Sequence, residues 1–410
     1  MSKIIFFNLP GHGHVNPTLP IVTELVQLGH HIIYYNSEEF REKIELTGAE
    51  FRPYPEPNPT PEKVSELVSS LVNVTVFLFG ESKRLLPFLL AELEREQPDL
   101  VMYDSITLWG MQAAHLLKFP TISSISTFVQ EDVAGIFQWR DYAHLLRHVL
   151  LLLPKIMQGR KQLVATYGQD VFPYKDIFPC VGETNIVYTS KEFQPETPFV
   201  DESFHFVGPS INTKARVAVD FPWELLENGR SKVYISLGTI HNHDVAFYKT
   251  AFATFADHPA QFILSAGPRT NIEALGDIPE NFIVRPFVPQ LELLPKVDVF
   301  ITHGGMNSVN EGLYFGVPLV AIPNHLEQTL NARMMEKNGA GIVLGNRPPY
   351  GRFRSEELRR AVDELLQNKQ YQQEAERLGD SFRAAGGYKT AVQHILSRLE
   401  QLQKHEQAVV

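Results

Sequence analysis

The sequence predicts an α/β protein of two domains, each a doubly wound parallel sheet. The first observation is a series of short runs of Ile, Val, Phe and Tyr without polar alternation, which is typical of strands buried on both faces. The second is that longer amphipathic segments separate these runs, and strand–helix alternation produces parallel sheets. The third is the length of 410 residues, because a domain holds on the order of 100–200 residues.

The apolar runs form two series, each long enough for one Rossmann-like domain. The elements expected in the first half are strands at Lys3–Asn8, His31–Tyr35, Leu100–Tyr103 and Thr121–Ser124, with helices such as Pro17–Leu28 and Leu85–Arg95. The strands expected in the second half are Lys232–Leu237, Gln261–Ser265, Phe282–Arg285, Val299–Thr302, Leu319–Ile322 and Gly341–Leu344. Beyond Ser355 the pattern is helical, and the last amphipathic helix covers Lys389–Leu402.

The domain boundary is expected near Phe206–Glu224, where Gly208, Pro209 and Pro222 interrupt a segment without periodicity. We therefore expect an N-terminal domain of residues 1–210 and a C-terminal domain of residues 211–385. A final helix within residues 386–410 is expected to pack back on the N-terminal domain.

Charge and cysteine content exclude several classes of function. The formal net charge is −10, and a phosphate backbone needs a basic surface, so nucleic acid is not an expected partner. Cys180 is the single cysteine; it permits neither an internal disulfide nor a thiolate metal cluster, and it fits the reducing cytoplasm. No stretch approaches the roughly 20 apolar residues of a membrane helix, so we expect a soluble, cytoplasmic protein without stable membrane insertion.

A glycine-rich turn in the second half is typical of phosphate binding. The apolar strand Val299–Thr302 leads into His303–Ser308, and a helix is expected over Val309–Phe315. This order presents backbone amides and the helix dipole to an anion, while Gly304 and Gly305 allow a ligand to approach the backbone. By itself the pattern equally fits a tight turn followed by a serine N-cap.

Three segments together carry a family resemblance. Phe287–Gln290, His303–Pro318 and Pro323–Ala332 occur in order and in register, and they resemble the donor-binding signature of the UDP-glycosyltransferases, glycosyltransferase family 1 with the GT-B fold. The similarity extends over nearly the whole chain and is greatest to the bacterial macrolide-type glycosyltransferases. It implies two Rossmann-like domains that face each other across a cleft, with an acceptor on the first and a UDP-sugar on the second.

The resemblance implies a role for each matching position of the donor site. Phe287 would stack on uracil, Val288 would pair with the uracil edge through its backbone, and Gln290 would contact the base or ribose. Glu311 would bind the ribose hydroxyls, and Glu327 stands where the family commonly has Asp. The remaining positions implied are His303, Gly305, Asn307 and Ser308 for the diphosphate, Ser236, Gly238 and Thr239 for a second phosphate loop, and Glu327 with Gln328 for the transferred sugar.

A second candidate site follows the first strand. The segment Leu9–Pro17 contains His12 and His14, which could be metal ligands, a catalytic base or ordinary loop residues. NAD binding is disfavoured because Asn16 stands where the dinucleotide fingerprint needs its third glycine. The stretch Gly13–Pro17 resembles the family's Gly-His-x-x-Pro segment, whose histidine is the general base, and this resemblance assigns the role to His14.

Asp104 follows the apolar strand Leu100–Tyr103 and matches the family aspartate that bonds the catalytic histidine. Taken alone it could be a loop residue or the N-cap of the next helix. With His14 it implies an inverting transfer of a sugar, expected to be glucose, from a UDP-sugar to a hydroxyl group. We expect no cofactor besides the UDP-sugar co-substrate and no metal, since no Asp-x-Asp segment occurs. The alternatives are a UDP-sugar epimerase and a non-catalytic nucleotide-sugar binding protein of the same fold.

The acceptor is expected to be a hydrophobic small molecule such as a flavonoid, a macrolide or another natural product. Phe77, Phe79 and Phe128 are candidates for its apolar lining, and core packing is the alternative for each of them. The amphipathic segment Asp141–Lys155 carries Arg147. We expect it to form a lid over the acceptor, with contact to a membrane surface as the alternative.

Overall fold

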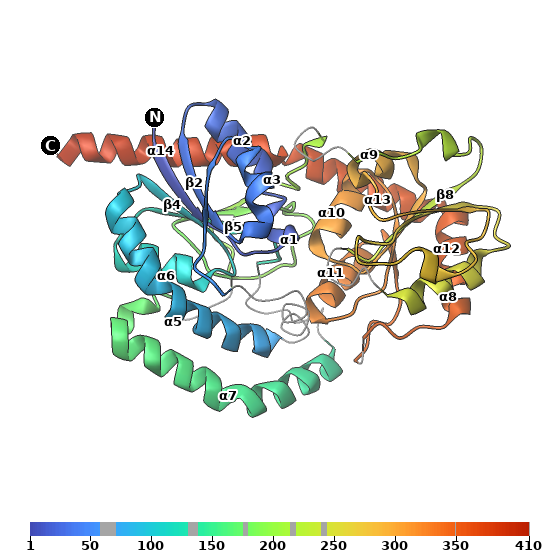
Figure 1. Cartoon of the computed structure of the whole chain (residues 1–410), viewed down its shortest axis with the longest axis horizontal. Coiled ribbons are helices and arrows are strands. Elements are labelled where there is room, and N and C mark those ends of the chain that lie inside the picture. Colours follow the sequence, from blue (N-terminus) through green and yellow to red (C-terminus); the bar gives the residue numbers. More distant parts are fainter. Residues whose placement is uncertain are drawn as a thin grey trace. The chain divides into compact units, whose positions relative to one another are not determined.

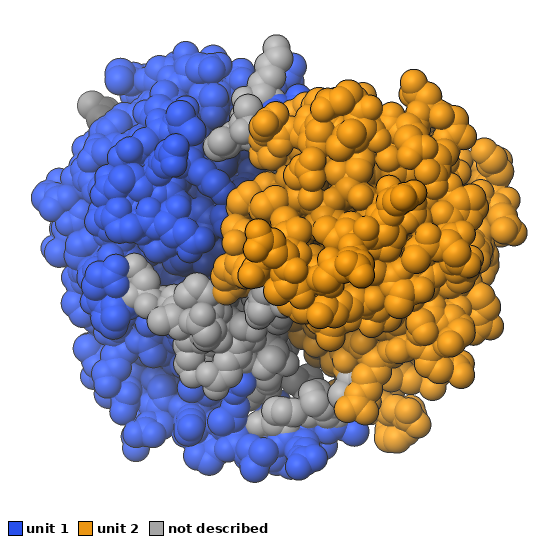
Figure 2. Space-filling view, turned by 45° about the vertical axis from the view of Figure 1, so that its right-hand side comes forward, with its two compact units in different colours: residues 1–134, 143–215, 382–410 blue, residues 135–142, 216–381 orange. Residues whose placement is uncertain are grey.

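The computed structural model describes residues 1–57, 71–129, 138–174, 179–213, 219–238, 244–348 and 350–409. The chain divides into two compact units, coloured separately in Figure 2. Unit 1 consists of Met1–Ala134, Ala143–Ala215 and Phe382–Val410, and unit 2 of Gly135–Tyr142 and Arg216–Ser381. No helix among the described residues is both long and apolar enough to span a bilayer.

Unit 1 is built on a seven-stranded parallel sheet in the order β3-β2-β1-β4-β5-β6-β7. The order reverses between β1 and β4, which makes this pair of strands the topological switch point. The strands are β1 (Lys3–Phe7), β2 (His31–Asn36), β3 (Glu50–Pro53), β4 (Leu100–Asp104), β5 (Thr121–Ile125), β6 (Thr184–Val187) and β7 (Phe204–Phe206).

Side chains of successive strand residues point to opposite faces of the sheet, and both faces are covered (Figure 1). Ile4 and Phe6 of β1 belong to the cluster formed with α2 (Leu19–Gln27), α3 (Arg41–Glu45) and α14 (Gly387–Val409). Their neighbours Ile5 and Phe7 belong to the cluster formed with α5 (Leu71–Glu96) and α6 (Leu108–Leu116). This double burial explains why the strands read as continuous apolar runs.

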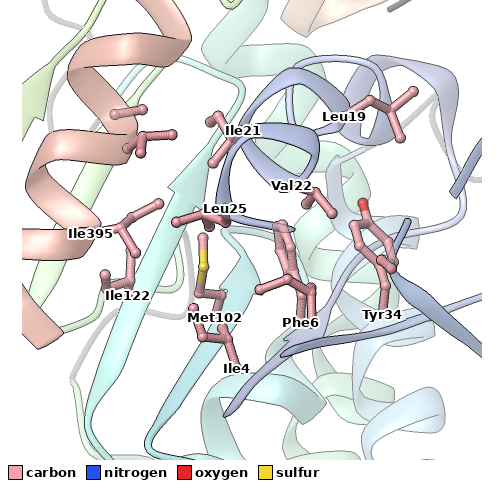
Figure 3. Close-up of a cluster of buried hydrophobic side chains, with 14 of the residues drawn as sticks. Ile4, Phe6, Leu19, Ile21, Val22, Leu25, Tyr34, Met102, Ile122 and Ile395 are labelled. Atoms are coloured by element: carbon pink, nitrogen blue, oxygen red, sulfur yellow. The ribbon is translucent and has the colours of Figure 1, made fainter. Parts of the chain in front are cut away.

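The C-terminal helix α14 returns the chain to unit 1. Figure 3 shows Ile395 of α14 beside Leu25 of α2 and Ile122 of β5. Ile395 is completely buried, and the amide of Gly387, at the start of α14, donates to the carbonyl of Val207. Helix α14, which begins 181 residues after the sheet's last strand ends at Phe206, therefore completes one of the two layers that cover the sheet.

Unit 2 repeats the architecture with six parallel strands in the order β10-β9-β8-β11-β12-β13. Helices α8 and α12 share a buried cluster with Val233 and Ile235 of β8, while α10 approaches the other face, where Gly312 leaves room for Phe300. The strands are β8 (Lys232–Ser236), β9 (Gln261–Ser265), β10 (Phe282–Arg285), β11 (Val299–Thr302), β12 (Leu319–Ala321) and β13 (Gly341–Val343). The helices of this half are α8 (Val245–Phe255), α9 (Gln290–Leu293), α10 (Met306–Tyr314), α11 (Leu326–Lys337), α12 (Ser355–Gln367) and α13 (Lys369–Ala384), and the remaining helices of the chain are α1 (His12–Val15) and α7 (Trp139–Tyr167).

The predicted fold class, two Rossmann-like parallel sheets, is confirmed. Every predicted strand is present, and β9, β10 and β11 have the predicted bounds. Three short strands were not predicted, β3, β6 and β7. They lie toward the two edges of the first sheet and carry polar residues such as Glu50 and Asn185, so they lack the apolar runs of the central strands.

The division into units differs from the expected domain bounds in one respect. Residues 135–142, expected in the N-terminal domain, group with unit 2. The physical reason is an ion pair between the carboxylate of Asp141 and the guanidinium of Arg333, both buried, to which the hydroxyl of Tyr350 adds a hydrogen bond of 2.8 Å. The domain boundaries expected after residues 210 and 385 correspond to unit boundaries after Ala215 and after Ser381.

We predict that Ile395→Ala destabilises unit 1, because it removes a fully buried side chain from the contact between α14 and the sheet. Such truncations cost about 2–5 kcal/mol. Urea unfolding followed by circular dichroism measures the loss. Ser397→Ala, an exposed position of the same helix, is the control and should change stability by less than about 0.5 kcal/mol. Equal stability of the two variants would show that α14 does not depend on this contact.

Candidate active site

In unit 1 the candidate functional side chains lie at the carboxyl ends of β1 and β4, the switch point of the sheet. Open parallel sheets bind ligands outside this edge. The chain leaves β1 through a loop and the short helix α1, which carries His14, while Asp104 is the last residue of β4. The parallel pairing of Phe7 with Tyr103 brings these two parts of the chain together.

His14 and Asp104 form a hydrogen-bonded pair. Nδ1 of His14 lies 2.8 Å from Oδ2 of Asp104, whose side chain is completely buried. The other carboxylate oxygen accepts the amide of Ile106 at 2.9 Å, and the helix that follows has Thr107 as its N-cap, so Asp104 does not cap it. Because a carboxylate only accepts hydrogen bonds, the Nδ1 proton lies on the side of Asp104 and Nε2 keeps its lone pair.

Ser126 is a neighbour of this pair to which the sequence analysis gave no individual role. Its Oγ lies 2.9 Å from Nδ1 of His14. Ser126 follows β5, which pairs with β4 through Asp104 and Ser124, so the residue comes to the same edge of the sheet as Asp104. The signal that could have found it is its place two residues after the predicted strand Thr121–Ser124.

His12 has a different environment from His14. Its Nδ1 lies 3.2 Å from Nζ of Lys43, and its ring packs edge-on against Phe40. Burial, with the nearby Lys43 charge as the second cause, lowers the pKa of His12 to about 4. His12 is therefore neutral near pH 7. Its Nε2 lies 3.6 Å from a carboxylate oxygen of Glu39, whose side chain is 66% exposed, whereas the carboxylate that His14 contacts at 2.8 Å is completely buried. The other reactive side chain nearby, Cys180, is buried, and burial raises the pKa of its thiol, which keeps the thiol protonated and unreactive.

In unit 2 the candidate residues again lie at the switch point, after β8 and β11. Ser236 ends β8 and pairs with Thr302, the last residue of β11. The ring of His303 lies between two glycines: a Cβ at Gly238 would come 2.7 Å from Nε2 of His303, and a Cβ at Gly305 2.5 Å from the same atom. Only glycine leaves room for the ring at these two positions. Thr239, predicted in the second phosphate loop, lies outside the described residues.

Helix α10 starts at Met306, three residues earlier than predicted. Its N-cap is Gly305, which has no side chain to cap the first turn. Asn307 and Ser308 therefore lie inside the first turn and do not precede the helix, because the backbone after Gly305 already follows helical geometry. The positive end of the α10 dipole and His303 thus lie together at this turn. Among the described residues no cluster of three or more His, Cys, Asp or Glu side chains could hold a metal ion.

The four residues predicted to bind the base and ribose come from the segment that follows β10 and from α10. The side-chain Nε2 of Gln290 donates to Oε2 of Glu311 at 2.6 Å, and the hydroxyl of Tyr234 donates to the side-chain Oε1 of Gln290 at 3.1 Å. This chain of bonds holds the buried carboxylate of Glu311 in one orientation. Phe287 lies on the loop after β10 with 55% of its surface exposed, and Val288 beside it is buried.

Asn331 connects the predicted sugar and phosphate positions, and the sequence analysis missed it. Its side-chain amide donates to Oε1 of Glu327 at 2.5 Å and to the carbonyl of Gly304 at 3.1 Å. Glu327 and Asn331 are four residues apart on α11, on the same side of the helix, and this spacing was a signal that could have found the pair. Gln328 is buried and accepts the amide of Asn324 at 2.8 Å.

The three phenylalanines predicted on the acceptor side have packing roles in the structure. Phe79 of α5 is buried, contacts Phe172 edge-on and faces Gly159 of α7. Phe128 is buried beside Phe193, with ring centroids 5.5 Å apart. Phe77 is partly buried against the same core as Phe79. Core packing, the alternative considered from the sequence, accounts for the contacts of Phe79 and Phe128.

Comparison with known proteins supports the resemblance to the UDP-glycosyltransferases. Residues 205–383 match the family model described as "UDP-glucoronosyl and UDP-glucosyl transferase". "Uncharacterized UDP-glucosyltransferase YojK" of Bacillus subtilis is 34% identical over 98% of both chains, and "Demethyllactenocin mycarosyltransferase" of Streptomyces fradiae is 28% identical over 94% of this chain and 84% of the relative. Among solved structures, the glycotransferase of kitacinnamycin superposes with a TM-score of 0.82 at 27% identity, covering 97% of this chain and 99% of that chain.

Two Rossmann-like sheets with these structural neighbours define a glycosyltransferase of the GT-B fold. Within that class, this chain belongs to the UDP-glucuronosyl and UDP-glucosyl transferase family. The resemblance found in the sequence and the prediction of an enzyme are both confirmed.

The lowered pKa of His12 predicts a loss of stability in mild acid. The pKa falls from 6.5 to about 4 on folding, so between these pH values the unfolded chain binds a proton that the folded chain does not. The stabilisation is fully present above pH 6.5 and is lost as the pH falls toward 4. The unfolding free energy of the wild type should fall in mild acid, and in His12→Gln this fall should be smaller by on the order of 1–3 kcal/mol. Urea unfolding across this pH interval measures it.

His115→Gln, which removes an exposed histidine from α6, is the matched control for this measurement. Some pH dependence should remain in His12→Gln, because burial also lowers the pKa of His205 and of His394. Identical pH profiles for His12→Gln and the wild type would contradict the assignment.

Proposed function

We propose that this enzyme transfers a sugar, with glucose as the first candidate, from a UDP-sugar to a hydroxyl group of a hydrophobic small molecule, with inversion at the anomeric carbon. The observation that carries the proposal is the bond between His14 and the fully buried Asp104. A neutral imidazole held by a carboxylate is suited to accept a hydroxyl proton.

The chemical step needs a base for the acceptor and a good environment for the leaving group. The acceptor oxygen forms a bond to the anomeric carbon while its proton passes to Nε2 of His14. The bond between the anomeric carbon and the β-phosphate oxygen breaks, and its electron pair leaves with UDP. The carboxylate of Asp104 stabilises the imidazolium that forms, as in the His–Asp part of a serine-protease triad. Attack opposite the leaving group converts an α-linked donor into a β-glycoside.

Unit 2 supplies the donor contacts in this proposal. The diphosphate would bind at His303 and the first turn of α10, where the helix dipole favours negative charge. We assign no metal to the step, because these groups already provide positive potential for the departing UDP. The exposed ring of Phe287 would stack on the base and Glu311 would bind the ribose. Asn331 would hold Glu327 toward the sugar.

The acceptor assignment is supported by the composition of unit 1 and by the relatives. Two similar proteins are named after demethyllactenocin and kitacinnamycin, which supports a small natural product as the acceptor. Acceptor activation then belongs to unit 1 and donor binding to unit 2. The cytoplasm is the proposed compartment, since the one cysteine, Cys180, is a free buried thiol.

The proposal predicts that incubation with UDP-glucose and a panel of phenolic and macrolide acceptors yields products heavier by one hexose, detected by mass spectrometry. EDTA should leave the rate unchanged. His14→Ala and Asp104→Asn should each lower the rate by at least about 10²-fold, the usual contribution of a general base, with UDP affinity by calorimetry nearly unchanged. His115→Gln is the control for loss of a histidine.

Four outcomes of this experiment would contradict the proposal. Wild-type turnover by His14→Ala would remove the base assignment. A changed UDP-sugar without any acceptor product would indicate an epimerase, and UDP-sugar binding without any product would indicate a binding protein. Activity lost in EDTA and restored by Mn²⁺ would overturn the metal-free mechanism.

The glycine contacts of His303 predict the effect of a single methyl group. Gly305 has φ −64° and ψ 144°, which alanine adopts without strain, but its Cβ would lie 2.5 Å from Nε2 of His303. Gly305→Ala should therefore displace the ring and weaken UDP binding about tenfold or more, a loss of at least ~1.4 kcal/mol. Gly80→Ala, where a Cβ meets nothing within 4 Å, is the matched control. Unchanged UDP affinity in Gly305→Ala would place the diphosphate elsewhere.

A further inference from the structure

Helix α7 (Trp139–Tyr167) exposes more large apolar side chains than any other described element. Leu150 is 63% exposed, Leu146 58% and Met157 63%. Half of the exposed large hydrophobic residues in the described part of the chain lie on this one helix. The residues concerned are Trp139, Tyr142, Leu146, Leu150, Leu151, Leu153 and Met157. Monomeric proteins seldom gather exposed apolar side chains in this way without a binding function.

The apolar side chains form a stripe along one side of α7. Leu146, Leu150, Leu153 and Met157, all in unit 1, are separated by three or four residues, the spacing that places side chains on one face of a helix. We call these four residues the α7 stripe. At 3.6 residues per turn the stripe extends over about three helical turns.

The α7 stripe is separate from the side of the helix that packs on unit 1. Leu163 is buried in the core shared with α5, Ile156 is partly buried there, and Gly159 lies against Phe79 of α5. In Figure 1, α7 runs along the outer side of α5, away from the sheet. The packing of α7 is therefore satisfied by other residues, and the stripe remains on the surface.

The charges of α7 indicate which partner the stripe fits. The helix carries five cationic side chains, Arg140, Arg147, Lys155, Arg160 and Lys161. Its one acidic side chain, Asp141, is buried in the ion pair with Arg333. Arg147 and Lys161 lie beside the stripe on a protein whose net charge is −10, since Arg147 follows Leu146 by one position and Lys161 follows Met157 by four. From such positions long cationic side chains reach phosphate headgroups while the apolar residues enter the acyl region.

We propose that α7 docks this protein on the surface of a membrane containing anionic lipids, lying in the plane of the interface. The α7 stripe enters the boundary between headgroups and acyl chains. The basic residues contact anionic headgroups. A second copy paired through α7 is disfavoured, since two helices of the same cationic character repel each other. Docking of this kind is peripheral and requires no membrane-spanning helix.

Flotation with lipid vesicles tests the proposal on the full chain. Wild type should float with vesicles of equal parts phosphatidylglycerol and phosphatidylcholine, and at least tenfold less with phosphatidylcholine alone or at high salt. Leu146→Glu combined with Leu150→Glu should abolish binding to both. Arg147→Glu combined with Lys161→Glu should remove the preference for phosphatidylglycerol. Both pairs are exposed, so circular dichroism should show unchanged folding.

Leu46→Glu is the matched control, because Leu46 is 69% exposed on unit 1 but lies outside α7. It should float like the wild type. Failure of the wild type to bind anionic vesicles, or equal loss in Leu46→Glu, would overturn the proposal. Sedimentation velocity provides the remaining outcome: a wild-type dimer that Leu146→Glu with Leu150→Glu dissociates, without vesicle binding, would show that a second copy covers the stripe.

Discussion

Parallel pairing places the carboxyl ends of all strands of a sheet at one edge, and a reversal of strand order leaves an opening there. Both sheets of this enzyme reverse next to their first strand, between β1 and β4 and between β8 and β11. The histidine–aspartate pair and the glycine turn follow these four strands, whereas Phe287 and Gln290 come after β10 at the edge of the second sheet. The two sheets therefore determine where chemistry is possible before any side chain is considered.

The two candidate sites, one in each unit, are stabilised by different physical interactions. In unit 1 a carboxylate withdrawn from water, Asp104, would be costly without donors, and His14 and the amide of Ile106 supply them. In unit 2 the important feature is that Gly238 and Gly305 have no side chains, because the ring of His303 occupies the space that they leave. Asn331 then couples the glycine turn to Glu327 through one amide group. The first site uses a buried charge, and the second uses backbone and a helix dipole.

Much of the fold could be predicted because the central strands are buried on both faces. A continuous apolar run such as Val299–Thr302 indicates a buried strand and also where that strand begins and ends. The strands toward the edges of the first sheet are different: β3 contains Glu50, Arg52 and Pro53, and its pairing with β2 depends on the neighbour more than on its own pattern. Helix α14 was predicted as a helix, but the residues that it covers, such as Ile122, are far away in sequence.

The sequence by itself determined the two glycine and histidine turns, the strands that precede them and, through the family signature, the class of enzyme. It did not distinguish His12 from His14 by chemistry, since both lie in one turn of the chain. Tertiary structure decided that question: His12 meets Lys43, while His14 meets Asp104, which lies 90 residues further along the chain. The physical reason is that a hydrogen-bond partner and a local dielectric are properties of neighbours in space, whereas strand formation and turn geometry depend mainly on neighbours in sequence.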